Sequence, residues 1–148
     1  MVTPYTRDKL TVVKFSWPVR VYYEDTDAGG VVYYANYLRF MERARTERLR
    51  QLGVEQQALR ESSGVLFAVR SAELDFLRPA RLDDALRVSA ELVECRRASL
   101  VFRQDVYQDG DESRVFCGAR VRVACLAAST LRPHPIPDFI LQGLTRGN

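Results

Sequence analysis

The residues best suited to chemistry form an acidic cluster that is followed by two glycines. Glu24, Asp25 and Asp27 come directly before an Ala-Gly-Gly segment at 28–30, and a helical pattern begins a few residues later. Glycine pairs let a ligand approach the backbone, and a helix start presents unpaired N–H groups with a partial positive charge. A carboxylate near those donors stays ionised, which suits a general base or a nucleophile. The alternative is structural, with Asp25 and Asp27 shaping an Asx-type turn or capping the helix.

Other catalytic chemistries have little support in the sequence. The single histidine, His134, lies between two prolines, which favours a turn or surface role over proton transfer. The three cysteines, Cys95, Cys117 and Cys125, lack CxxC spacing, so we expect reduced core residues rather than disulfides or metal ligands. No GxSxG, GxGxxG or P-loop pattern occurs, which leaves a hydrolase elbow or a nucleotide fold without support.

Length and composition indicate one ordinary globular domain. The 148 residues are 47% hydrophobic and 28% charged, as is typical of such domains. The formal net charge of +3 is too small and too dispersed to indicate a nucleic-acid-binding protein. We find no apolar run long enough for a membrane span and no signal-peptide pattern, so we expect a cytoplasmic protein. The expected domain covers residues 1–148, with loose ends at about 1–14 and 143–148.

The hydrophobic pattern predicts the elements that hold the acidic cluster. Residues 19–23 favour a strand, and apolar spacings of three, four and seven predict an amphipathic helix over 37–52 that ends at Gly53. A shorter helix over 55–61 follows it. Strand-like stretches then cover 66–76, 85–94, 99–107 and 115–126. This order predicts an α+β fold whose sheet packs one face on the long helix, while its other face and edges favour pairing with a second copy.

Residues 19–53 resemble the signature of the 4-hydroxybenzoyl-CoA thioesterase type of hotdog-fold protein. The resemblance is carried by VRVYYEDTDAGGVVYYANYLRFMERARTERLRQLG, and it extends through DFLRPARLDDALRV (75–88) and ECRRASLVFRQDV (94–106) to most of the chain. Within this family, the chain is most similar to the acyl-CoA thioesterases associated with the Tol-Pal system. The family fold is an antiparallel sheet wrapped around one long central helix, which agrees with the element order above. The resemblance also implies a homodimer or a homotetramer.

The resemblance assigns catalytic roles to two residues. Asp27 falls on the family's catalytic carboxylate, which either attacks the thioester carbonyl or activates a water to do so. Tyr34 falls on the helix-start position whose backbone N–H polarises that carbonyl. The Tol-Pal-associated branch commonly has a histidine where this chain has Tyr34, whereas the benzoyl branch accepts an aromatic residue there.

Four further residues fall on the stretches that contact the CoA phosphates in the family: Arg96, Arg97, Ser99 and Arg132. Arginine suits this role because its planar guanidinium binds phosphate oxygens bidentately and is always charged. Without the resemblance, Arg96 and Arg97 fit a solvated strand end better, since adjacent residues of a strand point to opposite faces.

The predicted function is therefore hydrolysis of an acyl-CoA thioester, with acyl carrier protein as a second candidate thiol carrier. No metal or other cofactor is expected, because CoA is part of the substrate. The alternative is a binding or scaffolding module that holds acyl-CoA or acyl carrier protein with weak or no hydrolysis. The presence of Tyr34 in place of the usual histidine favours this alternative. A hotdog dehydratase is disfavoured, because the family resemblance implies a histidine-dependent site for that reaction and the helix region here has no histidine.

Overall fold

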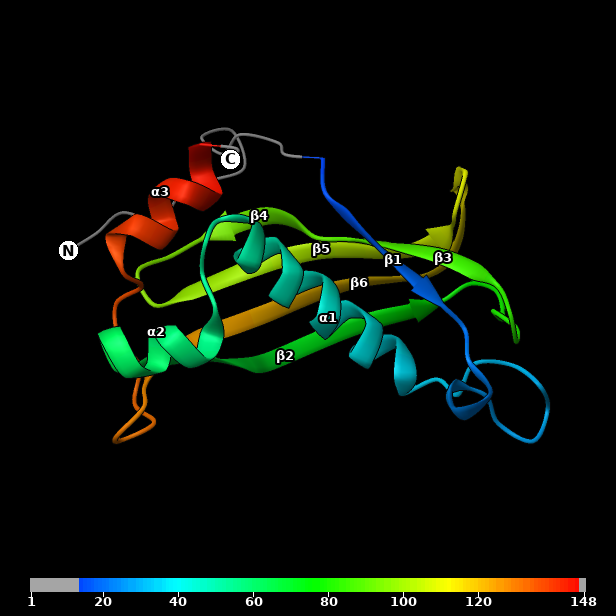
Figure 1. Ribbon diagram of the computed structural model, residues 1–148, viewed down its shortest axis with the longest axis horizontal. Helices are drawn as coiled ribbons and strands as arrows, with labels where there is room; N and C mark the ends of the chain where they lie inside the picture. Colours follow the sequence, from blue (N-terminus) through cyan, green and yellow to red (C-terminus); the bar gives the residue numbers. More distant parts are fainter. Residues whose placement is uncertain (1–13, 147–148) are drawn as a thin grey trace.

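The computed structural model describes residues 14–146, in which the helices lie on one side of a curved antiparallel sheet (Figure 1). The elements are β1 (Ser16–Arg20), the 3-10 turn η2 (Tyr23–Asp25), α1 (Asn36–Gln51), α2 (Gln56–Ser63), β2 (Val65–Phe76), β3 (Ala85–Ser89), β4 (Glu91–Cys95), β5 (Ser99–Gln108), β6 (Asp111–Ala127) and α3 (Asp138–Arg146). The strand order is β1-β3-β5-β6-β2, and β4 also pairs with β5. The predicted α+β fold is confirmed.

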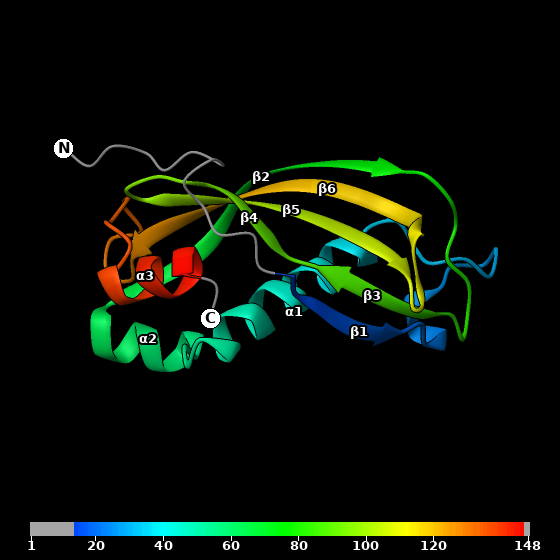
Figure 2. The ribbon, with the colours of Figure 1, turned by 90° about the horizontal axis from the view of Figure 1, so that it is seen from above.

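α1 packs beneath the arch of the sheet, as Figure 2 shows from above. Phe40, Met41 and Ala44 are fully buried on one face of this helix. β6 meets them with Val121 and Val123, whose side chains alternate along the strand with outward-facing arginines. Each large apolar side chain buried in this way contributes about 1.5–3 kcal/mol to folding. This packing fixes α1 across the sheet and thereby fixes where its first turn lies.

The predicted strand over 85–94 is two strands, β3 and β4, with a break at Ala90. At the break, the Asp105 N–H of β5 donates to Ser89 Oγ at 2.9 Å instead of to a backbone carbonyl. The Gln104 side chain donates to Ser89 O at 3.1 Å and to Met41 O of α1 at 3.0 Å. Side chains therefore replace the regular ladder at this point, which strand propensity alone does not indicate. The three cysteines are free and buried, as expected.

The expected loose end at 143–148 is wrong for residues 143–146, which continue α3. Ile140 and Leu144 lie on the buried face of α3, and Leu144 is only 1% exposed. Gly143 packs so closely on Leu52, the residue after α1, that a Cβ there would lie 3.3 Å from Leu52 Cδ1. α3 thus closes the core beyond the end of α1. The other expected loose end, 1–14, lies outside the described residues except for Lys14.

Candidate active site

The acidic cluster forms a tight hydrogen-bonded loop that returns the chain to the start of α1. The Asp27 N–H donates to Val31 O at 2.9 Å, and the Gly30 N–H donates to Asp27 O at 3.0 Å. The Tyr33 N–H then donates to Asp25 O at 2.9 Å, which closes the loop. Gly30 has a φ of +78°, a conformation that residues with a Cβ rarely adopt. Gly30 is therefore needed for the backbone conformation of this turn.

Asp25 has a structural role in this loop, as one of the two sequence interpretations predicted. Its side chain is buried, and its Oδ2 accepts a hydrogen bond from the Tyr22 N–H at 2.8 Å. Its backbone carbonyl accepts two more bonds, from the Tyr33 N–H and from the side chain of Asn36. Asp25 therefore fixes the root of the loop.

Asp27 is exposed in the single chain and shapes an Asx-type turn, because its Oδ1 accepts a hydrogen bond from the Gly29 N–H at 2.8 Å. Its second oxygen, Oδ2, forms no hydrogen bond within residues 14–146. One carboxylate oxygen is therefore oriented by the turn while the other stays available. The structural interpretation and a chemical role for Asp27 are compatible in this geometry.

Tyr34 lies two residues before α1, and its backbone N–H has no acceptor in the described part of the chain. Ala35 occupies the N-cap position and offers no side-chain cap, and the N–H groups of Asn36, Tyr37 and Leu38 donate to the backbone carbonyls of Tyr33, Tyr34 and Ala35. The Tyr34 N–H therefore lies free just before the positively polarised start of the helix. The arrangement can hold a negatively charged or polarised oxygen.

Aromatic side chains surround this helix start. The ring of Tyr34 lies 4.8 Å from that of Tyr33 and 6.1 Å from that of Phe76, measured between centroids. A hydrogen bond with the Tyr34 side chain raises the pKa of Tyr33. The hydroxyl of Tyr37 accepts a hydrogen bond from the Ala80 N–H at 3.2 Å and anchors the segment before β3. The Tyr34 side chain itself remains largely exposed.

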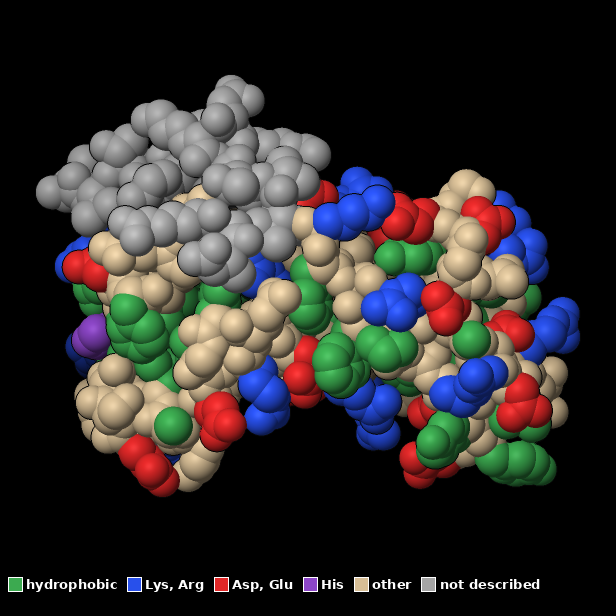
Figure 3. All heavy atoms as spheres, turned by 45° about the horizontal axis from the view of Figure 1, so that its top comes forward, with side chains coloured by type: hydrophobic (Ala, Val, Ile, Leu, Met, Phe, Trp, Pro, Cys, Tyr) green, Lys and Arg blue, Asp and Glu red, His purple; other side chains and the backbone are tan. Residues whose placement is uncertain are grey.

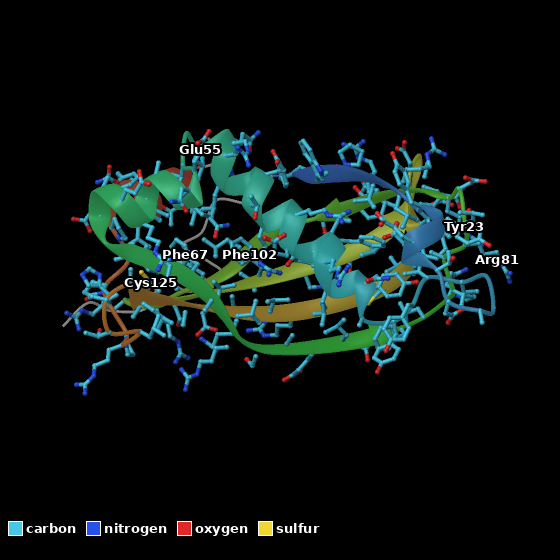
Figure 4. All side chains as sticks on the ribbon, turned by 60° about the horizontal axis from the view of Figure 1, so that its bottom comes forward. Tyr23, Glu55, Phe67, Arg81, Phe102 and Cys125 are labelled. Atoms are coloured by element: carbon cyan, nitrogen blue, oxygen red, sulfur yellow. The ribbon has the colours of Figure 1, made fainter. Side chains whose placement is uncertain are left out.

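Two hollows of about 250 Å³ and 490 Å³ run along α1 beside β2, and we name them together the α1–β2 groove. They share Glu42, Arg45 and Val69 in their walls. The smaller hollow is lined by Phe67 and Phe102, which lie between the helices and the strands in Figure 4. The larger hollow reaches Leu38, one helical turn after Tyr34. An apolar group attached near Tyr34 therefore has a groove to enter.

Arg45 is the buried charged residue of this groove. Its Nη1 donates to Oε1 of Gln104 at 2.9 Å, and burial lowers its pKa. The sequence does not mark this pair, because an arginine on a predicted amphipathic helix has no pattern that indicates burial.

The four residues expected to contact phosphates gather at one end of the sheet. Arg96 and Ser99 flank the β4–β5 turn, where the Arg96 N–H donates to Ser99 O at 2.8 Å. The Ile136 N–H donates to Arg97 O at 2.9 Å, and the Ala127 N–H donates to Arg132 O at 2.8 Å. These bonds bring the segment that follows β6 against the β4–β5 turn. The side chains of Arg97 and Arg132 are exposed.

Two of these four side chains are already engaged. Arg96 Nε lies 2.6 Å from Oε1 of Glu94, and Ser99 Oγ accepts a hydrogen bond from Arg122 at 3.2 Å. Burial opposes the charge of Glu94, but Arg96 and Arg122 outweigh it and lower the pKa of this carboxyl. Arg96 therefore has a carboxylate partner, whereas Arg97 and Arg132 have no ion-pair partner within residues 14–146.

The acidic loop and these arginines lie at opposite ends of the folded molecule. In Figure 4, Tyr23, which begins the turn before the loop, lies at one end, and Cys125 lies at the other. The Cys125 N–H donates to Ala98 O within the β4–β5 turn, so the arginines belong to the Cys125 end. α1, with 16 residues, spans about 24 Å between the two ends. A single chain does not bring the two sets together.

Three further observations concern surface charge, metal binding and membrane-spanning helices. On the face drawn in Figure 3, acidic and basic side chains are intermixed, with hydrophobic side chains between them. Within residues 14–146, no group of three or more His, Cys, Asp and Glu side chains is arranged to hold a metal ion. No helix in the same range is long and apolar enough to cross a membrane.

The fold is that of a hotdog-type thioesterase, and the chain belongs to the Thioesterase-like superfamily, which it matches over residues 21–144. It is 46% identical over 127 residues to the acyl-CoA thioester hydrolase YbgC of Escherichia coli O6:H1, covering 86% of this chain and 92% of that protein. It is 33% identical over 118 residues to a 1,4-dihydroxy-2-naphthoyl-CoA hydrolase of Thermosynechococcus vestitus, covering 80% of each. A probable thioesterase from Bartonella henselae has a TM-score of 0.77 at 32% identity, covering 84% of this chain and 100% of that one. The predicted family is confirmed.

Proposed function

We propose that this protein hydrolyses acyl-CoA thioesters to a free acid and CoA. Its relatives include an acyl-CoA thioester hydrolase at 46% identity over most of the chain. The observation that carries the proposal is the unpaired Tyr34 N–H at an uncapped helix start, beside a loop that carries a carboxylate with one free oxygen. Such a pair supplies the donor and the base that thioester hydrolysis requires.

In the proposed reaction, the thioester carbonyl oxygen accepts a hydrogen bond from the Tyr34 N–H. Asp27 then either removes a proton from a water that attacks the carbonyl carbon, or attacks this carbon to form an anhydride that water hydrolyses. The C–S bond breaks, and CoA leaves as a thiolate that takes up a proton. An oxyanion donor of this kind is worth about 3 kcal/mol of transition-state stabilisation. The proposal requires no metal and no cofactor other than the CoA of the substrate.

The proposal assigns the CoA phosphates to Arg96, Arg97, Ser99 and Arg132. Because these residues and Asp27 lie at opposite ends of α1 in one chain, we assign the two sets of one site to two copies. β2 is an edge strand, and Val69 and Phe76 on it are exposed. Unpaired edge strands with apolar side chains favour pairing with another chain. We therefore propose a homodimer or a homotetramer.

The acyl group is assigned to the α1–β2 groove, where apolar side chains such as Phe67 and Phe102 lie beside charged ones, so that it suits a hydrocarbon chain or an aromatic ring. The relatives include an acyl-CoA thioester hydrolase and a 1,4-dihydroxy-2-naphthoyl-CoA hydrolase, so both acyl classes are candidates. Acyl carrier protein remains a second candidate thiol carrier. We also propose a cytoplasmic location and an association with the Tol-Pal system, which the sequence and its family resemblance imply.

A thiol-release assay on the purified protein tests the proposal. The panel contains straight-chain acyl-CoA esters of increasing length and hydroxylated aromatic acyl-CoA esters. Binding of free CoA is measured separately as a control. Turnover of at least one ester above the uncatalysed rate is expected. Absence of turnover on the whole panel would contradict hydrolysis.

One observation favours the alternative of a binding module. Asp27 is exposed in the single chain, and one of its carboxylate oxygens is held by Gly29. A module of this kind would bind acyl-CoA with measurable affinity and release no thiol. The same panel, combined with calorimetric titration of a non-hydrolysable thioether analogue, separates the two functions.

A further inference from the structure

We infer that Asn36 is a positioning residue that holds the Asp27 loop against the start of α1, an inference that rests on the proposed function. Asn36 is the first residue of α1, and its side chain is buried. It does not touch the proposed reacting atoms. Its effect passes through the backbone of the loop and of the residue before Tyr34.

Asn36 bonds to both sides of the site. Its Nδ2 donates to Asp25 O at 2.9 Å, and its backbone N–H donates to Tyr33 O at 2.8 Å. The Tyr33 N–H donates to the same Asp25 carbonyl at 2.9 Å, so this oxygen accepts two bonds. Asp25 itself is held by its Oδ2 bond to the Tyr22 N–H. A closed network therefore joins the root of the loop to the first turn of the helix.

This network anchors the chain close to both the proposed base and the proposed donor. Asp27 follows the anchored Asp25 by two residues, and Tyr34 precedes Asn36 by two residues. The N–H groups of Asn36, Tyr37 and Leu38 donate to the carbonyls of Tyr33, Tyr34 and Ala35, whereas the Tyr34 N–H has no acceptor within residues 14–146. The Asn36 side chain donates to the loop rather than capping the helix. The helix start is thereby held in place while the Tyr34 N–H stays free.

Loss of the Nδ2 donor therefore frees the loop relative to the helix. In Asn36→Ala, the expected result is a fall in kcat of about tenfold or more, because small displacements of reacting groups slow catalysis strongly. Asn36→Asp keeps the shape but removes the donor when the carboxyl is ionised, so a comparable fall is expected. Asn36→Ser keeps a donor and should recover part of the kcat. The KM for the CoA ester should change by less than about twofold in all three, since substrate affinity is assigned to other residues.

Ser89→Ala is the matched control. It removes one side-chain hydrogen bond to a backbone N–H, that of Asp105, at a place within the sheet. A similar fall in Tm is expected for Ser89→Ala and Asn36→Ala, with kcat unchanged in Ser89→Ala. An equal loss of kcat in both variants would show a general stability effect and overturn the inference.

Amide hydrogen exchange gives a readout that does not depend on activity. The amides of Asp27, Gly30 and Tyr33 donate within the loop, so they should exchange faster in Asn36→Ala and at the wild-type rate in Ser89→Ala. Unchanged exchange in Asn36→Ala would contradict the positioning role even if kcat falls. If the wild type hydrolyses no thioester but the loop amides still respond, the proposed function fails and the anchoring of the loop stands.

Discussion

Asp27 is a residue whose type fits two roles, and the loop allows both. One carboxylate oxygen closes the turn onto the Gly29 N–H, which limits the rotation of the side chain. The other oxygen has no hydrogen-bond partner within residues 14–146. A general base benefits from this arrangement, because an oriented carboxylate loses less freedom when the substrate binds.

Gly29→Ala tests the orientation of this carboxylate. A Cβ at Gly29 would lie 3.2 Å from Asp27 Oδ1, so the carboxylate must shift. We expect kcat to fall about tenfold with little change in Tm, because a small displacement at the reacting group slows catalysis. Gly118→Ala is the control, since its Cβ would meet the Asp105 carboxylate at 3.1 Å in the sheet. Equal kcat losses in both variants would contradict a special role for Asp27.

The three cysteine thiols give a prediction on alkaline stability. Burial raises the pKa of Cys95 and of Cys125 to about 11, and burial with the nearby carboxylates of Asp105 and Asp75 raises that of Cys117 to about 12. The unfolded thiols lose their protons near pH 9, so the unfolded state binds fewer protons than the folded state above that pH. The free energy of unfolding should therefore fall from about pH 9 to 11, by up to about 1.4 kcal/mol per pKa unit for each thiol.

Urea unfolding at pH 7.5, 9 and 10.5 checks this prediction, with Cys125→Ala as the comparison. The variant should show a smaller loss of stability between pH 9 and 10.5 than the wild type. A parallel loss in both proteins would contradict a contribution from Cys125.

The site residues show how far sequence reasoning reaches. The sequence predicts a structural role for Asp25 and Asp27, and both have one, although only Asp27 forms the predicted Asx-type turn. The family resemblance was needed to single out Tyr34, because a free backbone N–H leaves no mark in residue type. Asn36 was missed for a related reason. An asparagine at a helix start usually signals a cap, and nothing local tells that its side chain donates to a carbonyl eleven residues earlier.

At the scale of elements, the sequence predicts the strongly periodic helix correctly, but it does not predict where tertiary contacts interrupt a strand. The predicted helix over 37–52 differs from α1 by one residue at each end. The split between β3 and β4 was missed, because it depends on the Ser89 and Gln104 side chains meeting the backbone. α3 was missed because its nine residues carry only a short apolar pattern. Its stability comes from docking on the core rather than from propensity.

Leu144→Ala tests whether α3 is an integral part of the fold. The side chain is almost fully buried, so its truncation should lower the free energy of unfolding by about 2–5 kcal/mol. Phe139→Ala in the same helix removes an exposed ring and should cost less than about 0.5 kcal/mol. Chemical denaturation measures both. A cost for Leu144→Ala as small as that for Phe139→Ala would show that α3 is not docked as described.

At the scale of the whole molecule, the separation between the acidic loop and the exposed arginines decides how the proposed site is assembled. The acidic loop and the exposed arginines lie at opposite ends of α1. If both serve one substrate, each site draws residues from two copies. The sequence predicted oligomerisation from its free sheet face and edges, but the distance between the two sets could not be read from it.

Mixing two inactive variants tests this shared assembly. Asp27→Asn lacks the proposed base, and Arg97→Ala/Arg132→Ala lacks two proposed phosphate contacts. If the sites are shared, a mixed dimer has one site with all the substitutions and one with none, so unfolding and refolding the two variants together should restore activity. The expected recovery is about a quarter of the wild-type rate, since half of the dimers are mixed and each has one intact site. Activity no higher than the sum of the separate variants would contradict a shared site.

The central claim is that the Asp27 carboxylate carries out thioester hydrolysis. Asp27→Asn keeps the shape of the side chain and an oxygen for the Gly29 N–H, but removes the negative charge. On an ester that the wild type hydrolyses, kcat should fall by about 100-fold or more, with an unchanged far-ultraviolet circular dichroism spectrum and unchanged CoA affinity. A folded Asp27→Asn protein that hydrolyses this ester at nearly the wild-type rate would contradict the account.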